Sequence, residues 1–382
     1  MCDGQMKYPF LDLKAANARY LGALRDAAMR VIDSGRYIGG EEVKAFELEL
    51  ASMCHAPHAV GVSNGLDALR LIFEGYKILG NLKEGDEVIV PANTYIATVL
   101  SVTQAGLTPV LVDPDPESMN LSAAGIRKAL TAGTKAIVAV HLFGRTCWDP
   151  EIAGISREKG ILFIEDAAQS IGARASTDGL FGSRMTGAIG HAGAFSFYPT
   201  KNTGALGDAG AVVTNDAALA DTVRALANYG SDRRYHNIYT GFNCRLDTIQ
   251  AAMLRAKLSD TDTANARRFA RAVAYDRHIL HPDVKKPVIP AVPQSCVWHQ
   301  YVVRLRPEHR EAFRKHLLDN GVETDIHYPV PPHLQPCYRD MPHGMLPVAE
   351  RLAEESVSLP IGDHLNESDI REIAEIINRF KI

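Results

Sequence analysis

Short apolar runs alternate with segments of helical periodicity between about residue 60 and residue 214. The apolar runs are DEVIVPAN, TPVLVDPD, KAIVAVHLFG, ILFIEDAAQ, AGAFSFYPT and AGAVVTN, and the helical segments between the first four are TYIATVLSVTQAG, SAAGIRKAL and EIAGISREKG. Strands that are apolar almost throughout are typical of a parallel sheet covered by helices on both faces. The pattern therefore predicts a large α/β domain with a mainly parallel sheet.

The pattern changes after residue 245. Apolar residues at helical spacing over more than 30 residues in RLDTIQAAMLRAKLSDTDTANARRFARAVAYDRHIL predict one long connecting helix. Beyond a proline-rich segment, WHQYVVRLR predicts a strand, EHREAFRKHLLDNG a helix, and the C-terminal region two more helices. We therefore expect a large domain over residues 1–250 and a smaller α+β domain over residues 251–382.

Composition excludes several classes of protein. Of the 382 residues, 46% are hydrophobic and 23% are charged, as in ordinary globular proteins. The formal net charge of -4 gives no broad basic field, so nucleic acid is not expected as a partner. The N-terminus lacks an apolar signal region and no run reaches 18 apolar residues, which predicts a cytoplasmic protein without a membrane anchor. No metal-binding spacing and no C-x-x-C pair is found, so we expect reduced thiols at Cys2, Cys54, Cys147, Cys244, Cys296 and Cys337.

Lys201 lies between an aromatic apolar run and a glycine-rich turn in AFSFYPTKNTGALGDAG. The preceding residues, 195–199, read as the end of a buried strand. Burial disfavours the charged form of an amine, so a lysine in such a pocket has a lowered pKa and can act as a nucleophile. The alternative is a lysine whose stem simply reaches solvent. A P-loop is excluded because the glycines follow the lysine.

Three other segments have both a structural and a functional interpretation. GVSNGLDALRLIF ends an apolar segment with Ser63, Asn64 and Gly65 and then begins a helix, whose start is either an ordinary N-cap or a phosphate site. In ILFIEDAAQ, Asp166 and Gln169 resemble a capping box at the start of a helix, or Asp166 is a strand-end carboxylate that faces a pyridine nitrogen. Tyr95, after another strand, either packs in the core or lies flat on a planar heterocycle.

The segment NYGSDRRYHNIYTGFNCRLDTIQ is rich in polar and cationic side chains. Residues 233–236 form a polar loop, and Asn243 and Arg245 lie at the turn that enters the long helix. The segment is either a solvated surface loop or a loop that reaches a phosphate or a carboxylate, in its own subunit or across a subunit boundary.

In this order, the motifs resemble the DegT/DnrJ/StrS-type family of pyridoxal-phosphate sugar aminotransferases. The resemblance spans nearly the whole chain and rests on SGRYIGGEEVKAFE, GVSNGLDAL, GDEVIVPANTYIAT, IEDAAQSIGA, FSFYPTKNTGALGDAGAVVT, NYGS and GFNCRLDTIQAA. It implies the type I fold of PLP-dependent transferases, pyridoxal 5'-phosphate as cofactor, and an assembly of at least two subunits.

The resemblance implies a role for each candidate residue. Lys201 would bind the cofactor covalently, and Asp166 would pair with the pyridine nitrogen. Gln169 would neighbour the phenolic oxygen and Tyr95 would stack on the ring. The remaining cofactor contacts would be the phosphate contacts of Gly65, Leu66, Ser196 and, from a second subunit, Asn243.

Within the family, these motifs most resemble those of the branch that aminates dTDP-linked 3-keto-6-deoxyhexoses with L-glutamate as amino donor. In that branch Tyr198, His327 and Tyr328 would lie near the sugar, together with Arg234 of the partner subunit. Thr203, Ala209 and Cys244 depart from the family's usual residues, which puts only substrate preference in question.

Three competing interpretations follow from the resemblance. A relative that removes a sugar hydroxyl has histidine in place of the lysine, so Lys201 argues against it. A 4-keto-sugar aminotransferase keeps every cofactor residue and differs only in the sugar pocket. A regulatory protein without catalysis could retain the same fold.

Overall fold

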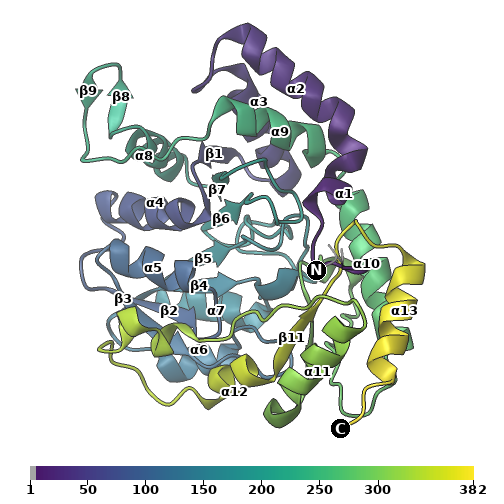
Figure 1. The fold of residues 1–382 in the computed structure, drawn as a ribbon. Helices are drawn as coiled ribbons and strands as arrows, with labels where there is room; N and C mark the ends of the chain where they lie inside the picture. Colours follow the sequence, from purple (N-terminus) through teal and green to yellow (C-terminus); the bar gives the residue numbers. More distant parts are fainter. Residues whose placement is uncertain (1–5) are drawn as a thin grey trace.

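Residues 6–382 are described by the structure, a computed structural model built around one seven-stranded sheet. The strand order is β1-β7-β6-β5-β4-β2-β3, and only β7 runs antiparallel to its neighbours (Figure 1). The predicted, mainly parallel α/β sheet is therefore confirmed. Its strands are β1 (His58–Val62), β2 (Glu87–Pro91), β3 (Thr108–Val112), β4 (Thr134–Val140), β5 (Leu162–Asp166), β6 (Ala192–Ser196) and β7 (Gly210–Thr214).

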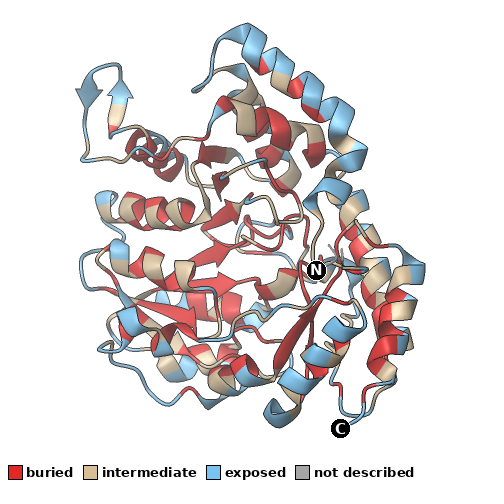
Figure 2. Ribbon diagram, viewed as in Figure 1, coloured by how far each residue is buried: buried red, intermediate tan, exposed pale blue. Residues whose placement is uncertain are grey.

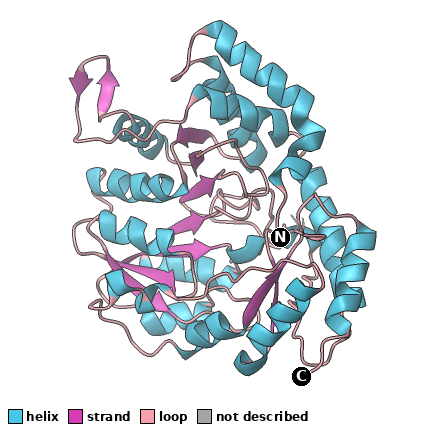
Figure 3. Ribbon diagram, viewed as in Figure 1, coloured by secondary structure: helices cyan, strands magenta, loops and turns pink. Residues whose placement is uncertain are grey.

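Helices cover both faces of this sheet, and the sheet itself is buried (Figures 2 and 3). In β4, alternate residues face opposite sides of the sheet. Val138 and the residues two positions before and after it join the core on one face, while Ile137 and Ala139 join the core on the other. This two-sided burial explains why the strand sequences are apolar almost throughout. The first face carries α4 (Gly65–Ile78), α5 (Ile96–Gln104) and α8 (Ala217–Ala227), and the second carries α3 (Glu41–Cys54), α6 (Ala123–Ala129), α7 (Pro150–Lys159) and α9 (Thr248–Leu258).

The prediction of one long connecting helix is wrong. Two helices, α9 and α10 (Thr261–His278), are separated at Ser259 and Asp260. The Asp260 carboxylate accepts hydrogen bonds from the Tyr20 hydroxyl at 2.5 Å and from the Arg267 guanidinium at 3.0 Å. These contacts hold Asp260 at the N-cap of α10, so the chain changes direction there although the apolar periodicity continues.

A second core is formed by the C-terminal part of the chain. Strand β10 (Tyr301–Arg304) pairs antiparallel with β11 (Ser356–Leu359), and helices α10, α11 (Pro307–Asp319) and α13 (Glu367–Asn378) pack on this pair. The sequence predicted β10, α11, α12 (Pro347–Glu355) and α13, but missed β11. The division of the chain at residue 250 stays a prediction.

The N-terminal helices α1 (Leu13–Asn17) and α2 (Leu21–Ser34) precede the sheet, and α2 packs on α9. The polar loop predicted around residues 233–236 is a small hairpin of β8 (Ser231–Arg233) and β9 (His236–Asn237), which projects from the body of the molecule (Figure 1). Within residues 6–382, no helix is both long and apolar enough to cross a bilayer.

Candidate active site

A cavity of about 550 Å³ opens where the parallel strands end, beside the second core. Its walls come from the ends of β5 and β6, the starts of α4 and α5, and the segments that flank the second core. Most of the residues predicted from the sequence line it: Gly65, Leu66, Tyr95, Asp166, Gln169, Ser196, Tyr198, Lys201, His327 and Tyr328.

Lys201 reaches the cavity from the turn that follows β6. Its backbone N–H donates to the carbonyl of Tyr198 at 2.8 Å, and its side chain is partly buried. Burial lowers the pKa of the Lys201 amine below its ordinary range, and the nearby Asp166 carboxylate opposes this shift. The position fits a buried, reactive amine better than a surface lysine.

The glycine-rich turn beyond Lys201 leaves no room for larger residues. A Cβ added to Gly204 would lie 2.3 Å from the carbonyl oxygen of Pro199. The carbonyl of Gly204 accepts a hydrogen bond from the buried Lys257 ammonium at 2.6 Å. The turn is therefore fixed by close backbone packing on one side and by a cation on the other.

Asp166 is the last residue of β5 and is 8% exposed. One carboxylate oxygen, Oδ2, accepts from the Thr98 hydroxyl at 2.7 Å, and Oδ1 accepts from the backbone N–H of Ala168 at 3.1 Å. No helix begins at Asp166, because the chain continues in turns, so the capping-box interpretation is wrong. The carboxylate is held in place at the wall of the cavity.

Gln169 connects two segments of the cavity wall through hydrogen bonds of its side-chain amide. Its Oε1 accepts from the backbone N–H of Phe143 at 2.6 Å, and its Nε2 donates to the hydroxyl of Tyr328 at 2.9 Å. The Tyr328 ring lies 5.2 Å from the ring of Tyr95, which is 55% exposed. Burial raises the pKa of Tyr328, so this hydroxyl stays protonated. The contacts join the end of β5 to the segment that follows α11, where Tyr328 lies.

The start of α4 forms the opposite end of the cavity. Asn64 caps the helix by accepting from the N–H of Asp67 at 2.8 Å, and this cap is compatible with a phosphate site at the amides that follow it. Among the described residues, no hydrogen bond uses the backbone N–H groups of Gly65 and Leu66. A Cβ added to Gly65 would lie 2.7 Å from the Cβ of Ser196, so only glycine lets the helix start approach β6 this closely.

Two predicted residues lie outside this cavity. Asn243 is exposed, and its backbone bridges to Asn228. Arg234 lies exposed in the β8–β9 hairpin, where its guanidinium stacks 4.9 Å from the ring of Tyr235. Neither side chain reaches the cavity of its own chain.

The sequence did not reveal three residues of the site. Thr98, one helical turn after Tyr95, fixes Asp166. His299 and Gln300 line the cavity from the two positions just before β10, in a segment where only a strand was predicted. The polar pair in WHQYVV, just before a run of buried strand residues, is the signal that marks them.

Comparison with known proteins now decides the family. The model of the DegT/DnrJ/EryC1/StrS aminotransferase family matches residues 22–378. The chain belongs to this family. Its cofactor is accordingly pyridoxal 5'-phosphate, and it is an aminotransferase.

Individual relatives agree with this assignment. The aminotransferase is 44% identical to dTDP-3-amino-3,6-dideoxy-alpha-D-galactopyranose transaminase of Aneurinibacillus thermoaerophilus, over 97% of this chain and 99% of the relative. It is 46% identical to the erythromycin biosynthesis sensory transduction protein EryC1 of Saccharopolyspora erythraea, over 94% of this chain and 96% of the relative. The crystal structure of S. venezuelae DesV in complex with a ketimine intermediate superposes with a TM-score of 0.91 at 42% identity, covering 98% of both chains.

The cavity of the aminotransferase fits pyridoxal 5'-phosphate. The free amides at the start of α4, with Gly65 against Ser196, suit a phosphate. The fixed Asp166 carboxylate suits a pyridine nitrogen, and Lys201 supplies an amine of lowered pKa in the same cavity. Within residues 6–382, no cluster of three or more His, Cys, Asp or Glu side chains is arranged to hold a metal ion.

Proposed function

We propose that the aminotransferase transfers the amino group of L-glutamate to a dTDP-linked 3-keto-6-deoxyhexose and so forms a 3-amino-3,6-dideoxyhexose. The observation that supports this most is the 44% identical relative, which is a transaminase of a dTDP-3-amino-3,6-dideoxyhexose and matches over 97% of this chain. The chain keeps Lys201 and Asp166 in one cavity, as such a reaction requires.

We assign the proton transfers to Lys201. Pyridoxal 5'-phosphate, when bound, supplies the electron sink that accepts the electron pair of a broken C–H bond. Burial lowers the pKa of Lys201 and so increases the share of neutral amine, whose Nζ can take up the released proton and later return it. Before the substrate arrives, the same Nζ would hold the cofactor.

The other residues bind and orient. Asp166, fixed by Thr98 and Ala168, would keep the pyridine nitrogen protonated. The amides of Gly65 and Leu66 and the hydroxyl of Ser196 would hold the phosphate. Tyr95 would cover the ring, and Gln169 would orient the phenolic oxygen.

The substrate site is proposed to need two subunits. Tyr198, His327 and Tyr328 line the cavity and would contact the sugar. Arg234 of the partner subunit would reach the nucleotide diphosphate, and Asn243 of the partner subunit would reach the cofactor phosphate. This fits the exposure of both residues in the single chain and makes the protein a homodimer. We place the reaction in the cytoplasm, where nucleotide sugars are made.

The test has two stages with purified protein. Mixing the cofactor-loaded enzyme with L-glutamate alone should convert the cofactor to its aminated form, which absorbance follows, and should release 2-oxoglutarate. The aminated enzyme is then offered 3-keto and 4-keto dTDP-sugars side by side. Faster amination of the 3-keto sugar is expected. A preference for the 4-keto sugar would overturn the substrate assignment, and absence of the glutamate reaction would overturn the choice of amino donor.

A further inference from the structure

His299 contributes an imidazole to the wall of the active-site cavity and is 6% exposed. Its Nδ1 lies 3.1 Å from Oδ1 of Asn202, the residue that follows Lys201. The guanidinium of Arg268 donates to the backbone carbonyls of Trp298 and His299 at 3.1 and 3.3 Å. The backbone at His299 is thus fixed, and one ring nitrogen is anchored beside the reactive lysine.

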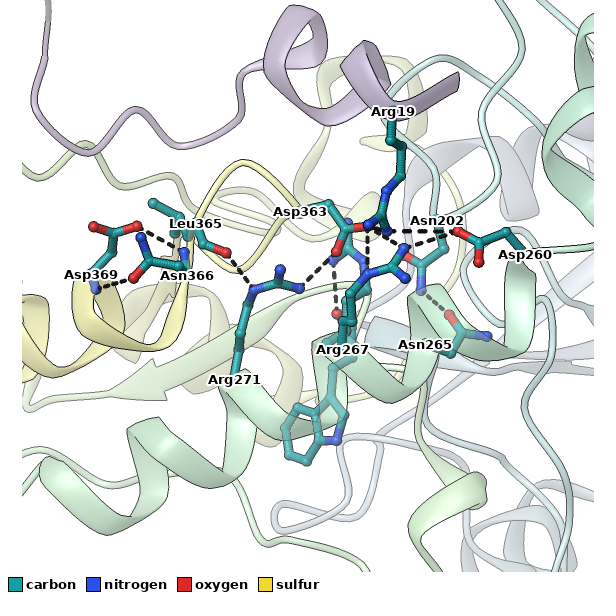
Figure 4. A network of polar contacts seen from close by, with 12 residues as sticks. Arg19, Asn202, Asp260, Asn265, Arg267, Arg271, Asp363, Leu365, Asn366 and Asp369 are labelled. Atoms are coloured by element: carbon teal, nitrogen blue, oxygen red, sulfur yellow. Dashed lines mark hydrogen bonds and ion pairs between the residues drawn. The ribbon is translucent and has the colours of Figure 1, made fainter. Parts of the chain in front are cut away.

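A chain of two amides determines which ring nitrogen carries the proton. The Asn265 amide donates to the carbonyl of Ile171 at 2.8 Å, so its oxygen is left to accept from Asn202 at 3.0 Å. The same Asn202 nitrogen donates to the carbonyl of Val297 at 2.9 Å, and Figure 4 shows Asn202 directed toward Asn265.

The direction of this chain is fixed because backbone carbonyls can only accept hydrogen bonds. Neither amide can be turned over without placing an oxygen against an oxygen. The oxygen of Asn202 must therefore face His299, and the Nδ1 of His299 must donate to it. In a neutral imidazole, Nε2 then bears a lone pair.

The surroundings keep this imidazole neutral. Burial lowers the pKa of His299 well below its usual range, and the positive charges of Lys201, Arg268 and His327 lower it further. Among residues 6–382, no hydrogen bond to Nε2 is found. His299 therefore offers an unused acceptor from the wall of the cavity.

We propose that His299 is a substrate-binding residue, whose Nε2 accepts a hydrogen bond from a hydroxyl group of the bound sugar while Asn202 and Asn265 hold the ring in the required tautomer. The inference rests on the proposed function. A lone pair selects for donors: sugar hydroxyls donate, whereas the carboxylates of glutamate only accept and are disfavoured there. The same enzyme must bind both substrates in one cavity, and an acceptor at this position helps it to discriminate the sugar from glutamate.

The first test is independent of activity and uses nitrogen-15 NMR of histidine-labelled protein without cofactor. The His299 signals are assigned by their loss in His299→Gln. We expect Nδ1 protonated and Nε2 unprotonated. His191 is an internal control of opposite tautomer, because its Nδ1 accepts from the backbone N–H of Phe163 at 2.9 Å. In Asn202→Asp, a carboxylate beside Nδ1 should protonate both nitrogens. A protonated Nε2 in the unchanged protein would overturn the proposal.

The second test separates the two half-reactions in His299→Phe and His299→Gln. The phenylalanine variant lacks an acceptor and should raise KM for the keto sugar about tenfold, while the glutamate half-reaction changes less than twofold. Glutamine, which has a carbonyl oxygen, should restore part of the loss. Equal losses in both half-reactions, or no change in either, would contradict the role in sugar binding. If the unchanged enzyme aminates no keto sugar, the proposed function is wrong. The NMR experiment still tests the tautomer of His299 in that case.

Discussion

The Asp166 carboxylate is held by hydrogen bonds and also lines the cavity. Thr98 and the N–H of Ala168 each bind one of its oxygens, so the carboxylate has a fixed orientation. The sequence could predict Asp166, because it ends an apolar run. It could not predict Thr98, which lies 68 residues away and meets Asp166 only in the folded chain.

Substitutions of Asp166 and of Thr98 should separate the effect of the carboxylate's charge on turnover from the effect of its orientation. Asp166→Asn keeps the shape but cannot stabilise a protonated pyridine nitrogen, so turnover should fall by several orders of magnitude. Thr98→Val removes one hydrogen bond to a charged group, which is worth about 1.5–3 kcal/mol, and should lower turnover about ten- to hundredfold. Steady-state kinetics measures both, with circular dichroism as the control for folding. Near-normal turnover of Asp166→Asn would contradict its assigned role.

Lys257 makes the stability of the protein depend on pH. Burial lowers the pKa of Lys257 from 10.5 to about 8. Between these values the unfolded chain binds the proton and the folded chain does not, so the free energy of unfolding rises with pH in this window. Below pH 8 the cost of burying the charge is fully present, and above pH 10.5 it is absent.

Comparison with Lys257→Met isolates this effect. Measured by urea denaturation without cofactor, the stability of the unchanged protein relative to the variant should rise by about 3 kcal/mol from pH 8 to pH 10.5. The hydrogen bond to Gly204 is lost in the variant at every pH and does not change this slope. A difference that is flat across the window would show that Lys257 has an ordinary pKa.

At the scale of elements, the site depends on the contact between the start of α4 and the end of β6. Gly65→Ala places a Cβ 2.7 Å from that of Ser196 and should push the two apart. We expect a loss of about 1–3 kcal/mol in stability and weaker retention of the cofactor. Denaturation and equilibrium dialysis measure the two effects.

Gly154→Ala is the matched control for this substitution. Gly154 lies within α7, and a Cβ there meets nothing within 4 Å. The change should leave cofactor binding unaltered and stabilise the protein by about 0.5–1 kcal/mol, because alanine favours a helix over glycine. Equal effects of the two substitutions would show that the close approach of α4 to β6 does not matter.

The elements that were predicted correctly are those whose hydrophobic pattern can be read within the segment itself. The strands of the large sheet are apolar because helices cover both faces, and this shows in the sequence. The break at Asp260 depends on Tyr20 and Arg267, and β11 exists because β10 offers it a partner. Such contacts join distant segments and leave no periodic signal.

At the scale of the whole molecule, the proposed site is completed by a second subunit. Arg234 and Asn243 do not reach the cavity of their own chain. Subunits of Lys201→Ala, inactive for lack of the lysine, are mixed with subunits that carry both Arg234→Ala and Asn243→Ala. Some mixed dimers should contain one intact site, so activity should return as the subunits exchange. No recovery, with exchange verified by mass spectrometry, would place both residues in the site of their own chain.

Covalent binding of the cofactor by Lys201 can be tested directly. Borohydride reduction of the loaded enzyme fixes the cofactor to the amine that holds it, and mass spectrometry of the digested protein then locates it. We expect the pyridoxyl group on the peptide that contains Lys201, and its absence after Lys201→Ala. Attachment in the unchanged protein to another lysine, such as Lys257 with its lowered pKa of about 8, would show that Lys201 is not the residue that binds the cofactor.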